Sequence, residues 1–181
     1  ISKNQIFNFA KKIIHFPRSL TGEGVRNTLK EVRNILPNLK IKAFKSGEKV
    51  FDWKIPLEWE VKDAFIINPE GKKICDYKDN KLHLVGYSIP VKKILSKKKL
   101  LKKLYSLPHL KNAIPYVTSY YKRDWGFCIS HKHKKKLKYG NYKVFINSRF
   151  KKGFLNYGEL LIKGKSNKEI ILSTYICHPE M

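Results

Sequence analysis

His178 is the residue whose surroundings most clearly suggest chemistry. It follows the apolar run from Glu169 to Cys177, which is rich in β-branched residues and long enough for a strand. Such a run is typical of a buried parallel strand, and active sites of α/β sheets lie at the carboxyl ends of these strands. We therefore expect the imidazole of His178 at a sheet edge, where it could ligate a metal ion. A hydrogen-bonded structural histidine is the alternative.

A second group of candidates surrounds two glycines near the amino end. Arg18, Thr21 and Glu23 lie around Gly22 and Gly24, directly before an apolar pattern with helical spacing. The free N–H groups at a helix amino terminus can hold an anion, so these residues are candidates for binding a substrate. A tight turn that needs flexible backbone is the other interpretation, and the sequence leaves both open.

Other polar residues also have two interpretations. Arg26 could hold a substrate carboxylate, or it could pair with Glu23 or Glu31 on the same predicted helix. His131 and His133 lie in a lysine-rich segment, where a solvated helix face is a better explanation than a metal-binding pair. We therefore exclude His131 and His133 from the candidate site.

The elements that must position these residues fall into three regions. Residues 1–38 predict two helices, because apolar residues recur at helical spacing and a proline closes each pattern. Residues 39–115 predict short strands joined by turns, followed by a lysine-rich helix. Residues 116–181 predict an α/β arrangement that ends in a hairpin. The predicted strands of the last region are Trp125–Ile129, Tyr142–Ile146, Phe154–Lys163 and Lys168–Cys177.

The charge of the chain is its most unusual bulk property. Lys and Arg number 39 against 14 Asp and Glu, which gives a formal net charge of +25. This balance is typical of proteins that bind nucleic acid or another anionic polymer. The lysines are spread through every segment, however, and arginines, which read bases best, are few. We therefore do not expect nucleic acid as a partner, and a basic binding module is the alternative function.

The cysteines and the hydropathy pattern indicate the compartment. Cys75, Cys128 and Cys177 are odd in number, widely spaced and set among apolar residues, as expected for reduced, buried thiols. No apolar stretch approaches the roughly 18 residues that a membrane span requires, and no signal peptide is recognisable. These features predict a cytoplasmic protein without a membrane partner.

Several stretches resemble one family. Pro17–Arg26, with the sequence PRSLTGEGVR, and Ser173–Pro179, with the sequence STYICHP, are similar to bacterial aminopeptidase-like proteins. That group belongs to the di-zinc aminopeptidase superfamily and carries an inserted domain of unknown function. Pro115–Tyr121, Asp124–Cys128 and Asn156–Leu160 resemble the same group, so the likeness spans nearly the whole chain.

The resemblance implies an α/β fold: a truncated aminopeptidase-like sheet with flanking helices plus an inserted small β-rich domain. Residues 1–38 and 116–181 would form the N-terminal part of the discontinuous, truncated aminopeptidase-like domain, and residues 39–115 would be the insertion. On this basis we expect the chain to be an N-terminal fragment of a longer bacterial protein.

The resemblance also implies a zinc-dependent hydrolase that cleaves peptide or amide bonds with metal-activated water. His178 matches the first of the histidines that bind two zinc ions, and Glu180 has the offset of an acid that orients the ring. The remaining ligands and the general base are expected after Met181. The isolated chain should therefore be inactive and bind zinc weakly at most. The implied substrate is a small peptide or an aminoacyl amide, and a homo-oligomeric state is compatible with the family.

Overall fold

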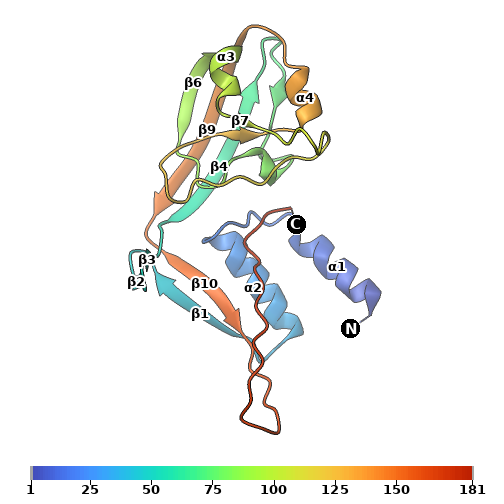
Figure 1. The fold of residues 1–181 in the computed structure, drawn as a ribbon, viewed down its shortest axis with the longest axis vertical. Helices are drawn as coiled ribbons and strands as arrows, with labels where there is room; N and C mark the ends of the chain where they lie inside the picture. Colours follow the sequence, from blue (N-terminus) through green and yellow to red (C-terminus); the bar gives the residue numbers. More distant parts are fainter. Residues whose placement is uncertain (1, 181) are drawn as a thin grey trace. The chain divides into compact units, whose positions relative to one another are not determined.

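The computed structural model describes residues 2–180, and its contacts divide the chain into two compact units (Figure 1). Unit 1 contains the residues up to Glu58 together with Lys151–Pro179, and unit 2 contains Trp59–Phe150 together with Glu180. Both units combine helices with small, mainly antiparallel sheets. The mixed α/β class predicted from the sequence is therefore confirmed.

The helices of unit 1 begin where the sequence offers helix-start signals. In α1 (Lys3–Ile13), the Ser2 hydroxyl accepts from the Gln5 amide while the Gln5 side chain accepts from the Ser2 amide. Helix α2 (Glu23–Ile35) buries Val25, Thr28 and Leu29, which share one face because their spacing matches the helical repeat. That face gives unit 1 its core.

The strands of unit 1 are short. Strand β1 (Lys40–Lys45) pairs antiparallel with β10 (Phe154–Glu159), and the two lie side by side in Figure 1. Strands β2 (Lys49–Val50) and β3 (Trp53–Lys54) form a small hairpin. Helix α2 packs on β10 at Gly158, where a Cβ atom would lie 3.0 Å from the Leu29 Cδ2 atom. The missing side chain lets the helix approach the strand closely.

Unit 2 is built on a four-stranded sheet with the order β5-β4-β9-β6. Its strands are β4 (Glu58–Ile67), β5 (Lys73–Ile74), β6 (Val91–Ser96) and β9 (Asn141–Lys151). Along β9, Tyr142, Val144 and Ile146 are almost fully buried, whereas the alternate positions are exposed or half-exposed. The alternation shows that one face of the sheet covers the core and the other faces solvent.

Shorter elements enclose the core of unit 2. They are η1 (Lys81–His83), α3 (Lys97–Leu101), β7 (Leu104–Tyr105), β8 (Phe127–Cys128) and α4 (His131–Lys135), with β7 and β8 forming a parallel pair. Leu100 and Phe127 are completely buried. The solvated helix face expected around His131 and His133 corresponds to α4, where the Ser130 hydroxyl accepts from the His133 amide and caps the helix.

The cysteines agree with the prediction of reduced thiols. All three are free, and Cys75 and Cys128 are buried in unit 2. Burial raises the pKa of both thiols to about 12, because a thiolate would lose its hydration there. Cys177, in unit 1, is half-buried.

The β-rich region differs from the sequence-based expectation in two places. Residues 81–83 lie in the region expected to contain short strands, but they form η1, because the Asn80 side chain accepts from the Leu82 amide and favours a turn. Strand β6 was not predicted, because only Val91 of its six residues is buried and the adjacent Lys92 and Lys93 interrupt the apolar pattern. Pro90 immediately precedes this strand, a position that proline tolerates well.

The largest difference from prediction concerns residues 160–178. The structure assigns them no helix or strand, and Ile170, Ile171 and Leu172 are 90%, 86% and 93% exposed. Strand β10 pairs with β1, so the predicted hairpin with residues 168–177 is wrong. A strand requires a hydrogen-bonded neighbour, and none of the described strands pairs with this segment. The buried parallel strand predicted before His178 is therefore absent from the described chain.

Unit 2 differs in its limits from the insertion predicted at residues 39–115, which stays a prediction about domain organisation. Strands β4 and β9, which enter and leave the unit, are neighbours in one sheet. A unit with adjacent ends can be accommodated within another fold without disturbing it. Among the described residues, no helix has the length and apolar character needed to cross a membrane.

Candidate functional site

A buried arginine connects the two ends of unit 1. Arg18 lies in the loop between α1 and α2, and only 4% of its surface is exposed. Its Nε donates to the carbonyl oxygen of His178 at 2.8 Å, and its Nη1 donates to the carbonyl oxygen of Ile13 at 3.1 Å. Hydrogen bonds from a charged donor are stronger than neutral ones, so the guanidinium fixes the backbone at His178.

The loop that carries Arg18 is shaped by its glycines. A Cβ atom on Gly24 would lie 2.4 Å from the Pro17 carbonyl oxygen, so the first turn of α2 presses directly on the loop. Gly22 has a φ of +99°, a conformation that side chains disfavour. The Ser19 hydroxyl donates to the Thr21 carbonyl at 2.7 Å. These contacts account for the glycines by backbone geometry, which favours the tight-turn interpretation.

The three predicted substrate-binding residues have different environments. Arg18 and Thr21 are buried within the loop, whereas Glu23 is exposed in the first turn of α2. An acidic residue there stabilises the helix through its dipole. The structure thus brings Arg18 and Thr21 together and leaves Glu23 toward solvent, and their roles toward a substrate stay predictions.

His178 is half-buried beside an aromatic ring. The Tyr175 and His178 rings meet edge to face, with centroids 4.6 Å apart. Partial burial lowers the pKa of His178, and the nearby Arg18 charge lowers it further. The imidazole is therefore neutral at physiological pH, the form in which a histidine binds a metal ion.

Glu180 has a backbone that strains an ordinary side chain. Its φ is +57°, and its carboxylate accepts from the Lys81 amide at 3.3 Å. The role predicted for Glu180, to orient the His178 ring, stays a prediction. The hydrogen bond to Lys81 shows that the carboxylate also has a backbone partner.

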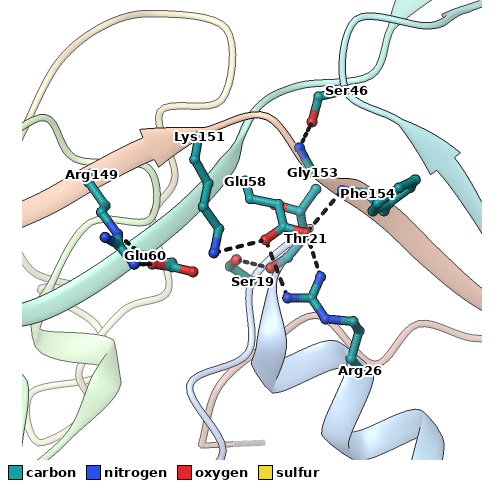
Figure 2. Close-up of polar contacts among 10 residues, drawn as sticks. All are labelled: Ser19, Thr21, Arg26, Ser46, Glu58, Glu60, Arg149, Lys151, Gly153 and Phe154. Carbon is teal, nitrogen blue, oxygen red and sulfur yellow. Dashed lines mark hydrogen bonds and ion pairs between the residues drawn. The ribbon is translucent and has the colours of Figure 1, made fainter.

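Sequence reasoning missed a buried ion pair in unit 1. Glu58 is 2% exposed, and Arg26 of α2 contacts both of its carboxylate oxygens (Figure 2). The Phe154 amide donates to the Glu58 Oε1 at 2.9 Å, and Lys151 lies 3.9 Å from Oε2. Gly153 makes room, because a Cβ there would lie 2.3 Å from the Glu58 Cδ. Figure 2 shows these groups converging on one carboxylate.

The electrostatics of Glu58 follow from these contacts. Burial acts to raise its pKa, but the hydrogen bonds from Arg26 and Phe154 outweigh that effect. The net pKa lies below the usual value of a glutamate, so the side chain is ionised at neutral pH. Arg26 therefore pairs with neither Glu23 nor Glu31, and Glu31 instead pairs with Lys12 at 2.6 Å. Nothing in the sequence links positions 26, 58 and 154.

The described residues do not by themselves make a metal centre. Across residues 2–180, the structure contains no group of three or more His, Cys, Asp or Glu side chains arranged to hold a metal ion. Catalytic zinc needs three protein ligands, and His178 supplies at most one. The two zinc ions implied by the sequence resemblance therefore do not fit the residues of this chain alone.

A family profile and two relatives show what this chain is similar to. The profile of a domain of unknown function, DUF2172, matches residues 58–149, about the extent of unit 2. The chain belongs to the DUF2172 family. It is also 44% identical over 177 residues to a Clostridium acetobutylicum protein, a candidate polysaccharide biosynthesis protein with an aminopeptidase-like domain.

A solved structure supports the same relationship. The crystal structure of a candidate peptidase from Clostridium acetobutylicum superposes with a TM-score of 0.89 at 43% identity. The match covers 98% of this chain but 42% of that chain, and 41% of the curated relative. The chain thus spans about two fifths of the length of the relatives that it matches. The similarity to a relative with an aminopeptidase-like domain and the match to a domain of unknown function confirm that part of the predicted resemblance.

Proposed function

We propose that this chain is the His178-bearing part of a zinc-dependent aminopeptidase-like hydrolase that cleaves a peptide or amide bond. The likeness to aminopeptidase-like relatives over 98% of the chain carries the proposal. The other three fifths of those relatives would supply the remaining zinc ligands and the general base. A small peptide or an aminoacyl amide is the proposed substrate.

The contacts around His178 in unit 1 support the proposal that this chain positions one ligand of such a site. Arg18 holds the main chain of His178, and partial burial together with the Arg18 charge keeps the imidazole neutral. A neutral, positioned imidazole has its lone pair available for a metal ion. By itself the chain has one such ligand, so we expect it to be inactive and to bind zinc weakly or not at all.

The test is a chimaera in which this chain replaces the matching two fifths of the Clostridium acetobutylicum relative. We expect the chimaera to retain zinc after dialysis and to hydrolyse an aminoacyl p-nitroanilide. His178→Ala should reduce both the zinc content and the rate. His109→Ala is the matched control, because His109 is exposed in a loop of unit 2.

Zinc content is measured by plasma mass spectrometry, and folding by circular dichroism. A folded chimaera that neither binds zinc nor cleaves any aminoacyl amide in a panel would overturn the proposal. Equal zinc content in the His178→Ala and His109→Ala variants would remove His178 from the metal site while leaving the hydrolase proposal intact.

A further inference from the structure

The solvent-facing side of the unit 2 sheet carries aromatic and basic side chains that have no role in the proposed hydrolase. We define the outer sheet face by Phe65 of β4, Lys73 of β5, Lys92 and Ile94 of β6, and Lys143 and Phe145 of β9. Lys92 is directly opposite Phe145, and Ile94 is directly opposite Lys143, so these four share one face. Their neighbours Val144 and Ile146 point to the core and are 1% and 2% exposed.

Two phenylalanine rings lie side by side at the centre of this face. The centroids of Phe65 and Phe145 are 5.2 Å apart, with the ring planes tilted by 36°. The ammonium of Lys73 lies 4.4 Å from the Phe65 centroid and also pairs with Asp76 at 3.1 Å. Lys73 therefore occupies a face of Phe65, and Phe145 is the ring better placed to receive another flat group.

Cations flank Phe145 in two directions. Lys92 is its cross-strand partner, where Cβ atoms are about 5 Å apart, and Lys143 lies two residues along β9, about 7 Å away. Both lysines are exposed, and Ile94 beside them is 65% exposed. The face thus combines two aromatic rings with lysines close enough to contact the phosphates beside a base stacked on Phe145.

We propose that the outer sheet face binds single-stranded nucleic acid, with Phe145 stacking on a base and Lys92 and Lys143 contacting the adjacent phosphates. Stacking on aromatic rings beside a basic track is how proteins hold single strands without reading their sequence. The rings of Phe65 and Phe145 carry no polar atom, so they suit the flat face of a base better than the hydroxyl-rich surface of a sugar.

The proposal is independent of the hydrolase function and gives a use to the net charge of +25. The sequence alone set nucleic acid aside because the lysines are scattered and arginines are few. Sequence-tolerant stacking does not require arginine, because specific contacts to base edges are absent. A duplex would not fit, because its bases are stacked on one another and shielded from Phe145.

The first experiment measures the binding of the full chain to fluorescein-labelled dT15 by fluorescence anisotropy between 50 and 200 mM NaCl. We expect the double variant Lys92→Gln/Lys143→Gln to bind at least about tenfold more weakly, and its salt slope to fall by about 1.4. The matched control is Lys98→Gln/Lys99→Gln on α3, which removes the same charge from exposed positions on a helix rather than on the sheet. Its affinity should change by less than about threefold.

The second experiment tests the stacking contact. Phe145→Leu keeps an apolar side chain but removes the ring, and we expect about tenfold weaker dT15 binding with an unchanged salt slope. Phe51→Leu is the control, because Phe51 is 92% exposed in unit 1. Circular dichroism melting curves verify that each variant is folded.

Three results would overturn the proposal. The first is the absence of dT15 binding at 50 mM NaCl. The second is equally tight binding to a 15-base-pair duplex or to heparin, with the Phe145→Leu variant unaffected, which would indicate charge attraction alone. The third is equal weakening by the two lysine double variants, which would show that no particular face is used.

Discussion

Two runs that the sequence predicts as strands differ in what the structure makes of them. Residues 142–150 form most of β9 and alternate between buried and exposed positions, whereas residues 169–177 form no strand and leave Ile170, Ile171 and Leu172 at least 86% exposed. Strand β9 lies between β4 and β6, which satisfy its backbone groups on both sides. The second run has no paired strand among the described residues. The difference teaches that an apolar run becomes a strand only when neighbours complete its hydrogen bonds.

The largest expected effect compares one isoleucine from each run. Ile146→Ala, at a position 2% exposed, should lower the free energy of unfolding by about 2–5 kcal/mol, because it leaves a cavity in the core of unit 2. Ile171→Ala, at a position 86% exposed, should change it by less than about 0.5 kcal/mol. Urea unfolding followed by circular dichroism measures both. Comparable losses would show that residues 169–177 are buried in solution.

A smaller loss of stability is expected when an acid–arginine pair is broken, and a buried pair in unit 1 is compared with an exposed pair in unit 2. Glu58→Gln should cost about 3 kcal/mol, because it leaves the Arg26 guanidinium and the Phe154 amide facing a weaker acceptor in a buried site. The control, Glu60→Gln, breaks a pair with Arg149, whose side chain is 73% exposed, and should cost at most about 1 kcal/mol. Denaturant titrations at pH 7 compare the two, and equal costs would contradict the assigned burial.

The pair between Glu58 and Arg26 also predicts how stability depends on pH. The folded-state pKa of Glu58 lies below its unfolded value, so its stabilising contribution is complete above about pH 4.3 and is lost as pH falls toward the folded-state pKa. The stability difference between the wild type and Glu58→Gln should therefore shrink progressively in acid. A difference that stays constant from pH 7 to pH 3 would mean that the carboxylate is not held ionised by Arg26.

The smallest expected change concerns the attachment of the segment that carries His178. Arg18→Gln removes charged hydrogen bonds to the His178 and Ile13 carbonyls, at a cost of about 1.5–3 kcal/mol. Deuterium uptake should rise in peptides containing His178 and stay unchanged in peptides from β9. Arg33→Gln, at an exposed position on α2, is the control. Unchanged uptake around His178 would show that Arg18 does not hold this segment.

Local sequence signals predicted the helices and several strands correctly. The apolar spacing and proline breaks identified α1 and α2, and the predicted strands Tyr142–Ile146 and Phe154–Lys163 overlap β9 and β10. These features depend on interactions between residues a few positions apart, which a single sequence displays directly. The family resemblance was also present in short motifs such as Pro17–Arg26.

Long-range partners were decided by the tertiary structure. The bonds between Arg18 and the His178 carbonyl, between Arg26 and Glu58, and between β10 and β1 join residues 160, 32 and over 100 positions apart. No periodicity encodes such pairs, because each depends on how separate elements pack. The sequence alone therefore determined the helices, several of the strands and which family the chain resembles. Only the folded structure decided which strands pair, which charges are buried and where His178 is held, since these are properties of packing.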